Sequence, residues 1–160
     1  MLALCHWIDR TPFFVSINSW TPLAILLEVV HYFSLFMIVG SMGIVDFRIL
    51  GILGRKQNVA DLADDMLPWM WIGVVLNVIS GFVMFSAEAT AYYQSPPFRI
   101  KMLLVLLAIV FGIVVNRNAA KWGQLSSIPP GAKVVAFVAI VLWISAILTG
   151  NEVPAISGTG

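Results

Sequence analysis

Pro22-Leu-Ala-Ile-Leu-Leu-Glu28-Val-Val-His31-Tyr32 begins the stretch that decides the fold, and this stretch continues to Gly51. It opens a segment of about 24 mostly apolar residues, which is long enough to cross a bilayer as a helix. Glu28 and His31 are the only glutamate and the only histidine inside an apolar segment of this chain. An ionisable side chain at membrane depth is costly and therefore indicates a functional site.

The composition is that of an integral membrane protein. The chain has 160 residues, of which 60% are hydrophobic and 11% are charged, whereas soluble domains carry about 25% charged residues. The net charge of +1 is uninformative about polyanionic partners, but no basic run is present that could follow a phosphate backbone. No nucleic-acid partner is therefore expected, and the lipid bilayer is the expected one. The single cysteine, Cys5, excludes an internal disulfide and a CxxC metal site, and residues 1–10 lack the features of a signal peptide.

Hydropathy and turn signals predict one all-α domain, an up-down-up-down bundle of four membrane-spanning helices. The spans are expected at about residues 22–45, 67–87, 98–117 and 132–150. Residues 1–21 are expected to form an amphipathic lead-in at the membrane interface.

The predicted boundaries rest on proline and on charge. Thr11-Pro12 and Thr21-Pro22 are typical helix starts, and Pro68 is expected to open the second span. The run Asp46-Phe-Arg48, together with residues 51–65, is interpreted as a polar connection that contains a short surface helix.

The positive-inside rule predicts the orientation in a bacterial inner membrane. The first and third connections carry most of the cations: Arg48, Arg55, Lys56, Arg117, Lys121 and Lys133. The opposite side carries only Arg10, Arg99 and Lys101. Both termini are therefore expected on the periplasmic side.

Small and polar residues at helical spacing predict where the spans pack. In the second span they are Gly73, Asn77, Ser80, Met84 and Glu88, with Gly81 beside them. Small residues let membrane helices approach closely, and polar ones hydrogen-bond across the contact. Asn77 is a candidate site residue because an amide in the membrane requires a partner.

Three interpretations of His31 remain open from the residues alone. It could hydrogen-bond Asn77 or a serine and order the bundle. It could be an axial ligand to haem iron, which suits a neutral imidazole in an apolar core. It could also bind a metal together with Glu28.

Arg99 and Lys101 open the third span on the side nearer His31. They could extend to lipid head groups, as basic side chains at helix ends commonly do. They could also hold an anion at the helix N-terminus. If haem iron met His31, they would lie about one propionate arm away from it in depth.

Four short motifs carry a resemblance to a known family: His31, Gly40, Asp46-Phe-Arg48-Ile-Leu-Gly51 and Phe98-x-x-Lys101. They resemble an uncharacterised family of four-helix bacterial inner-membrane proteins. That family is distantly similar to copper-resistance D domains and to bacterial membrane protoporphyrinogen oxidases. The resemblance implies haem b with His31 as ligand and Lys101 near a propionate, but it implies no particular activity.

The first functional hypothesis is therefore a haem-b-binding protein for electron transport, or a membrane anchor for a redox partner. An alternative is a cofactor-free accessory subunit that packs in a larger membrane complex or a homo-oligomer. A weaker alternative is a porphyrinogen-oxidising enzyme. The sequence assigns no catalytic residue.

Overall fold

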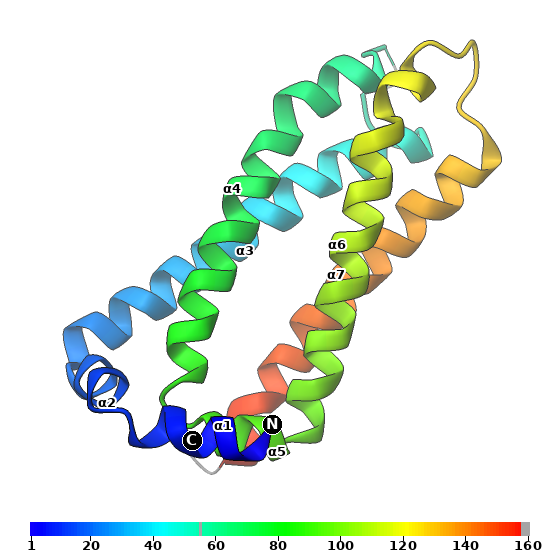
Figure 1. The fold of residues 1–160 in the computed structure, drawn as a ribbon. Coiled ribbons are helices and arrows are strands. Elements are labelled where there is room, and N and C mark those ends of the chain that lie inside the picture. The colour runs from blue at the N-terminus through cyan, green and yellow to red at the C-terminus, as the bar shows by residue number, and fades with distance from the viewer. Residues whose placement is uncertain (55, 158–160) are drawn as a thin grey trace.

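The computed structural model describes residues 1–54 and 56–157, with side chains described only as far as residue 150. The described residues form seven helices and no strand (Figure 1), which confirms the all-α prediction. In chain order they are α1 (Leu2–Arg10), α2 (Pro12–Ser19), α3 (Thr21–Leu50), α4 (Val59–Phe85), α5 (Ala89–Gln94), α6 (Pro96–Gly123) and α7 (Pro130–Ser157).

Four of these helices are long and apolar enough to cross a membrane: α3, α4, α6 and residues Pro130–Gly150 of α7. Their mean hydropathies are 2.0, 1.8, 2.6 and 2.3. Each of the four expected spans falls on one of them, so the chain is a multi-pass membrane protein. The helices are longer than the spans. The 30 residues of α3 extend about 45 Å.

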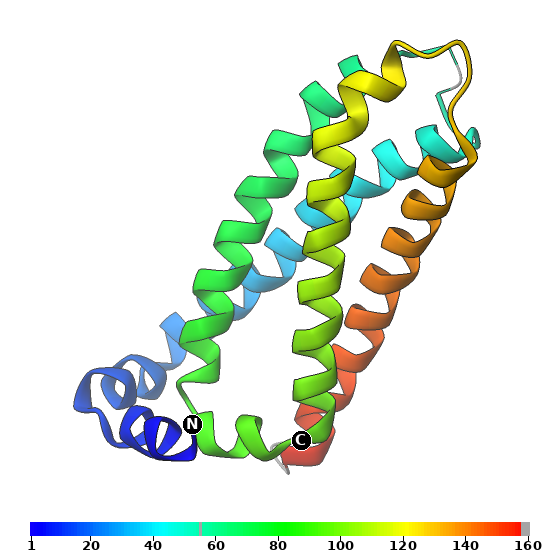
Figure 2. The same cartoon turned by 45° about the vertical axis from the view of Figure 1, so that its right-hand side comes forward.

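The four long helices pack side by side, and successive ones run in opposite directions along the chain (Figures 1 and 2). α3 contacts α4 and α7, and α6 contacts the same two helices, so the four form a closed ring. Ile38, Met42 and Val45 of α3 and Met70 of α4 are buried at its centre. Alanines on the opposing helices, among them Ala108 and Ala136, are fully buried and let the backbones approach.

Two helices extend beyond the expected spans. Asp46 and Arg48 lie inside α3 and not in a connection, because the helix continues to Gly51. Gly51 ends it in the left-handed conformation, with φ of 78°, and Ile52 N–H donates to the Phe47 carbonyl at 3.0 Å. This is the usual glycine helix stop.

α4 begins at Val59, well before Pro68. Asn58 caps it by accepting a hydrogen bond from Ala60 N–H at 2.8 Å. Val59, Leu62 and Ala63 are buried, while Asp61 and Asp64 are exposed. The acidic residues thus lie on the exposed face of an amphipathic start of α4. From the sequence, these residues are expected in a connection.

The Thr-Pro starts are confirmed, since α2 begins at Pro12 and α3 at Thr21. The short helices α1, α2 and α5 gather at one end of the bundle (Figure 2). Cys5 and Ile8 of α1 bury against Ala89 of α5. Asp9 joins the same two helices, because its carboxylate accepts hydrogen bonds from Ala89 N–H at 2.7 Å and Thr90 N–H at 3.2 Å, and from the Thr90 hydroxyl.

We expect Asp9→Ala to destabilise α5, because three donors then lose their acceptor at a helix N-terminus. Losses of this kind cost roughly 1–2 kcal/mol. Hydrogen exchange at Ala89 and Thr90 in the detergent-solubilised protein should therefore speed up by about tenfold. Asp64→Ala is the matched control, because that exposed carboxylate forms no hydrogen bond with a described residue. Equal exchange in the two variants would contradict the capping role.

Candidate functional site around His31

His31 lies on α3 with its ring half-buried against α4. Its Nδ1 is 3.1 Å from the Ser80 hydroxyl. Ser80 is 1% exposed, and its hydroxyl also lies 2.7 Å from the Leu76 carbonyl. A hydroxyl has one proton to donate, and the shorter contact with the carbonyl takes it. His31 Nδ1 then donates to Ser80, which leaves Nε2 of a neutral ring with its lone pair.

The imidazole packs on a glycine of the facing helix. A Cβ placed on Gly81 would lie 2.9 Å from His31 Cε1 and 3.4 Å from Nδ1. Any side chain at position 81 would push the ring away from Ser80. Gly81 therefore sets how closely the ring approaches α4, while Tyr32 lies edge-on to it at 6.5 Å.

A second set of hydrogen bonds holds the backbone of His31. The Asn77 amide donates to the His31 carbonyl and to the Ser34 hydroxyl, both at 3.0 Å. Ser34, which is fully buried, donates to the same carbonyl at 2.7 Å. The Asn77 amide therefore has the hydrogen-bond partner that a position in a membrane span requires. This partner is the backbone carbonyl of His31 and not its imidazole ring.

The two cations expected at the site, Lys101 and Arg99, lie in different surroundings. Lys101 of α6 is half-buried. Its Nζ would lie 3.3 Å from a Cβ on Gly150, so the ammonium packs against α7. Arg99 is exposed and is held by α5. Its Nε donates to the Tyr93 carbonyl at 2.8 Å, and its guanidinium lies 5.5 Å from the Tyr93 ring.

The remaining candidate, Glu28, is exposed, and its carboxylate forms no hydrogen bond or ion pair with a described residue. Within the described part of the chain, no three His, Cys, Asp or Glu side chains come together as a metal-binding group. The other histidine, His6, is at the surface with Nδ1 3.3 Å from the Thr90 hydroxyl.

An aromatic cluster closes the same end of the bundle. Phe85 of α4 stacks on Phe98 of α6 at 5.4 Å, and Tyr92 of α5 packs against both rings. Burial raises the pKa of the Tyr92 hydroxyl and the nearby Glu88 raises it further, so the phenol stays neutral. The cluster ties α5 to the two helices that carry Ser80 and Lys101.

Sequence reasoning missed two polar residues. Ser34 lies one turn after His31 on the same face, and that spacing could have indicated its role. Asp46 is 0% exposed in α3, and neither carboxylate oxygen has a hydrogen-bond partner among the described residues. The signal for Asp46 was its position four residues after Met42, on the buried face of the helix.

One protein family matches residues 15–155, with the description "Family of unknown function (DUF6644)". No curated protein and no solved structure matches the sequence.

Proposed function

The chain belongs to the DUF6644 family, and we propose from the geometry around His31 that it is a membrane protein that binds haem b. His31 is the proposed axial ligand, through Nε2. The proposed role is electron transport, or anchoring a redox partner to the membrane. When bound, haem b supplies one-electron exchange at its iron.

The observation that carries the proposal is the hydrogen bond between His31 Nδ1 and the Ser80 hydroxyl. Histidines that ligate a metal generally donate their other ring N–H to a nearby acceptor, which fixes the tautomer and the ring orientation. Ser80 has this role here, and Gly81 permits the close approach that the bond requires. The residues around His31 therefore fit the ligand role.

Lys101 is the proposed partner of a propionate. It lies on the neighbouring hairpin, where it is half-buried, and a half-buried ammonium is stabilised by an anionic partner. Arg99 would have to break its hydrogen bond with the Tyr93 carbonyl before it could bind a propionate. Its proposed position is therefore at the edge of the haem site. Asn77 then holds the backbone of His31, and Glu28, which is exposed, has no proposed contact with the cofactor.

The proposed topology is the up-down-up-down bundle in a bacterial inner membrane, with residues 1–21 at the interface and both termini in the periplasm. Arg48, Lys121 and Lys133 support this orientation, because they belong to the helix ends opposite α1 and α5 (Figure 1). A redox partner would then meet the protein on the His31 side. The pairing of a first-span histidine with an early lysine in a later span also supports distant kinship with copper-resistance D domains and protoporphyrinogen oxidases.

The test is a reduced-minus-oxidised visible spectrum of the purified protein in detergent, with a pyridine haemochrome to count haems. We expect a b-type band at about one haem per chain. A folded protein without a band, even after incubation with haemin, would overturn the proposal. It would favour the accessory subunit, whose packing surface would be the exposed apolar faces of the spans.

A further inference from the structure

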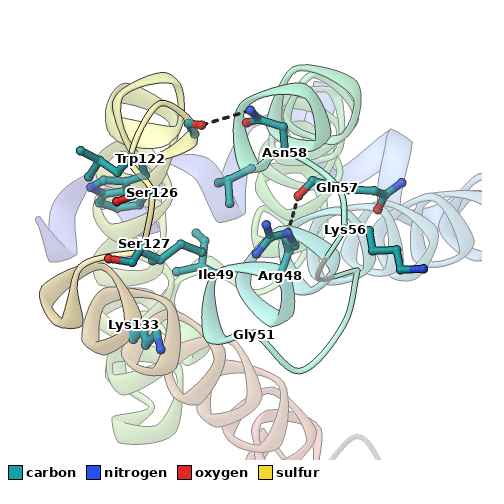
Figure 3. Close-up of a pocket in the computed structure, with 14 residues that line it drawn as sticks. Arg48, Ile49, Gly51, Lys56, Gln57, Asn58, Trp122, Ser126, Ser127 and Lys133 are labelled. Carbon is teal, nitrogen blue, oxygen red and sulfur yellow. Dashed lines mark hydrogen bonds between the residues drawn. The ribbon is translucent and has the colours of Figure 1, made fainter.

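A cavity of about 440 Å³ opens at the end of the bundle away from His31. It lies where α3 ends and α7 begins, between the connection that follows Gly51 and the connection that follows Gly123 (Figure 3). Arg48 is about 26 Å along α3 from His31. The cavity is therefore separate from the site described above, and its volume is in the range of small-molecule sites.

The cavity has an apolar floor and a polar wall. Ile49 and Trp122 form part of the floor and are 0% and 9% exposed. Arg48, Lys56 and Lys133 bring three positive charges from three parts of the chain, and Ser126 and Ser127 add two hydroxyl groups. No acidic residue is among the described residues that line it.

The three cations are not equivalent. Lys56 extends away from the two serines in Figure 3. It also lines a neighbouring pocket whose walls include Asp61 and Asp65. Arg48 is fixed beside the cavity, because its Nε donates to the Gln57 carbonyl at 2.6 Å. The ammonium group of Lys133 forms no hydrogen bond or ion pair with any described residue.

Helix dipoles do not decide the charge of the cavity, because α4 and α7 begin near it while α3 and α6 end there. Asn58 contributes no free amide donor to it either. Its Nδ2 donates to the Gly123 carbonyl at 3.1 Å and its Oδ1 caps α4. The donors available to a ligand thus include Lys133, the two serine hydroxyls and the guanidinium of Arg48.

We propose that this cavity binds a phosphate group, held by Arg48 and Lys133 and by the hydroxyls of Ser126 and Ser127. A fixed guanidinium recognises phosphate oxygens in pairs, a lysine adds a point charge, and two hydroxyls suit a tetrahedral anion. The phosphate could belong to a lipid head group or to a soluble phosphate compound. Both sources present the same chemistry to these residues.

The test titrates the full-length protein in detergent with two probes, and binding is followed by calorimetry. One probe is inorganic phosphate, compared with chloride at equal ionic strength. The other is dihexanoyl phosphatidylglycerol, compared with dihexanoyl phosphatidylcholine. We expect saturable binding of at least one anionic probe. Binding of phosphate alone identifies a soluble ligand, and binding of the glycerol lipid alone identifies a head group.

Lys133→Gln should weaken binding roughly tenfold. Lys121→Gln is the matched control, because it removes one exposed positive charge from the same end of the bundle but outside the cavity. A double variant, Ser126→Ala with Ser127→Ala, removes the two hydroxyl groups without changing the charge of the cavity. It should also weaken binding. Equal losses in the two lysine variants would show only general electrostatic attraction and would overturn the proposal. Absence of saturable binding by both probes would overturn it as well.

Discussion

His31→Ala is expected to abolish the b-type absorption band while the protein still inserts into the membrane. The substitution removes the proposed iron ligand, and Ser80 and Asn77 offer the metal no comparable nitrogen. The spectrum of the purified variant, normalised to protein, is the measurement. His6→Ala is the matched control, because it removes the other histidine from a surface position beside Thr90. That variant should keep the band.

The His31→Ala spectrum is informative only if the variant folds. Circular dichroism and gel filtration in detergent should match the parent, since Asn77 and Ser34 bind the backbone carbonyl of residue 31 and not the ring. An unchanged band in His31→Ala would rule out this histidine as the ligand.

Gly73→Val is expected to destabilise the bundle strongly. A Cβ on Gly73 would lie 2.9 Å from both the Ser34 carbonyl oxygen and Ile38 Cγ1, and 3.2 Å from the Ile38 nitrogen. Two of these atoms belong to the backbone of α3, so a side-chain rotation cannot relieve the clash. The two helices would have to separate, at a cost of about 3 kcal/mol.

The free energy of unfolding in mixed detergent and SDS micelles measures this cost. Gly40→Val is the matched control, because a Cβ at Gly40 meets nothing within 4 Å. Both variants place a β-branched residue in a long helix, so the difference between them reports the contact between α3 and α4. Equal stabilities would show that the two helices do not depend on the close approach at Gly73.

Local sequence signals predicted the parts of the fold that depend on local physics. The four apolar helices follow from hydropathy, and the helix starts at Thr11-Pro12 and Thr21-Pro22 follow from the fixed geometry of proline. Asp46 and the start of α4 were misplaced because charge was interpreted as the end of a helix. A charged residue can continue a helix when the apolar face continues past it, as Val59 and Leu62 do in α4.

Other features depend on residues far apart in the chain, which a local pattern does not reveal. The short helix α5 was not predicted, because its N-terminus is capped by Asp9, about 80 positions earlier. The candidate site was predicted only in part. The sequence indicated His31, Asn77 and Lys101 by their depth, but the pairing of His31 with Ser80, and of Arg99 with the α5 carbonyls, requires the packed helices.

The decisive measurement for His31 as the haem ligand is imidazole rescue of a His31→Gly variant. A glycine leaves space for a free imidazole molecule against Gly81, within reach of the Ser80 hydroxyl. We expect the variant to purify without the b-type band. Added haemin and imidazole together should restore the band, while haemin alone should not. A band that is present without imidazole, or one that imidazole fails to restore in a folded variant, would contradict the assignment of His31 as the haem ligand.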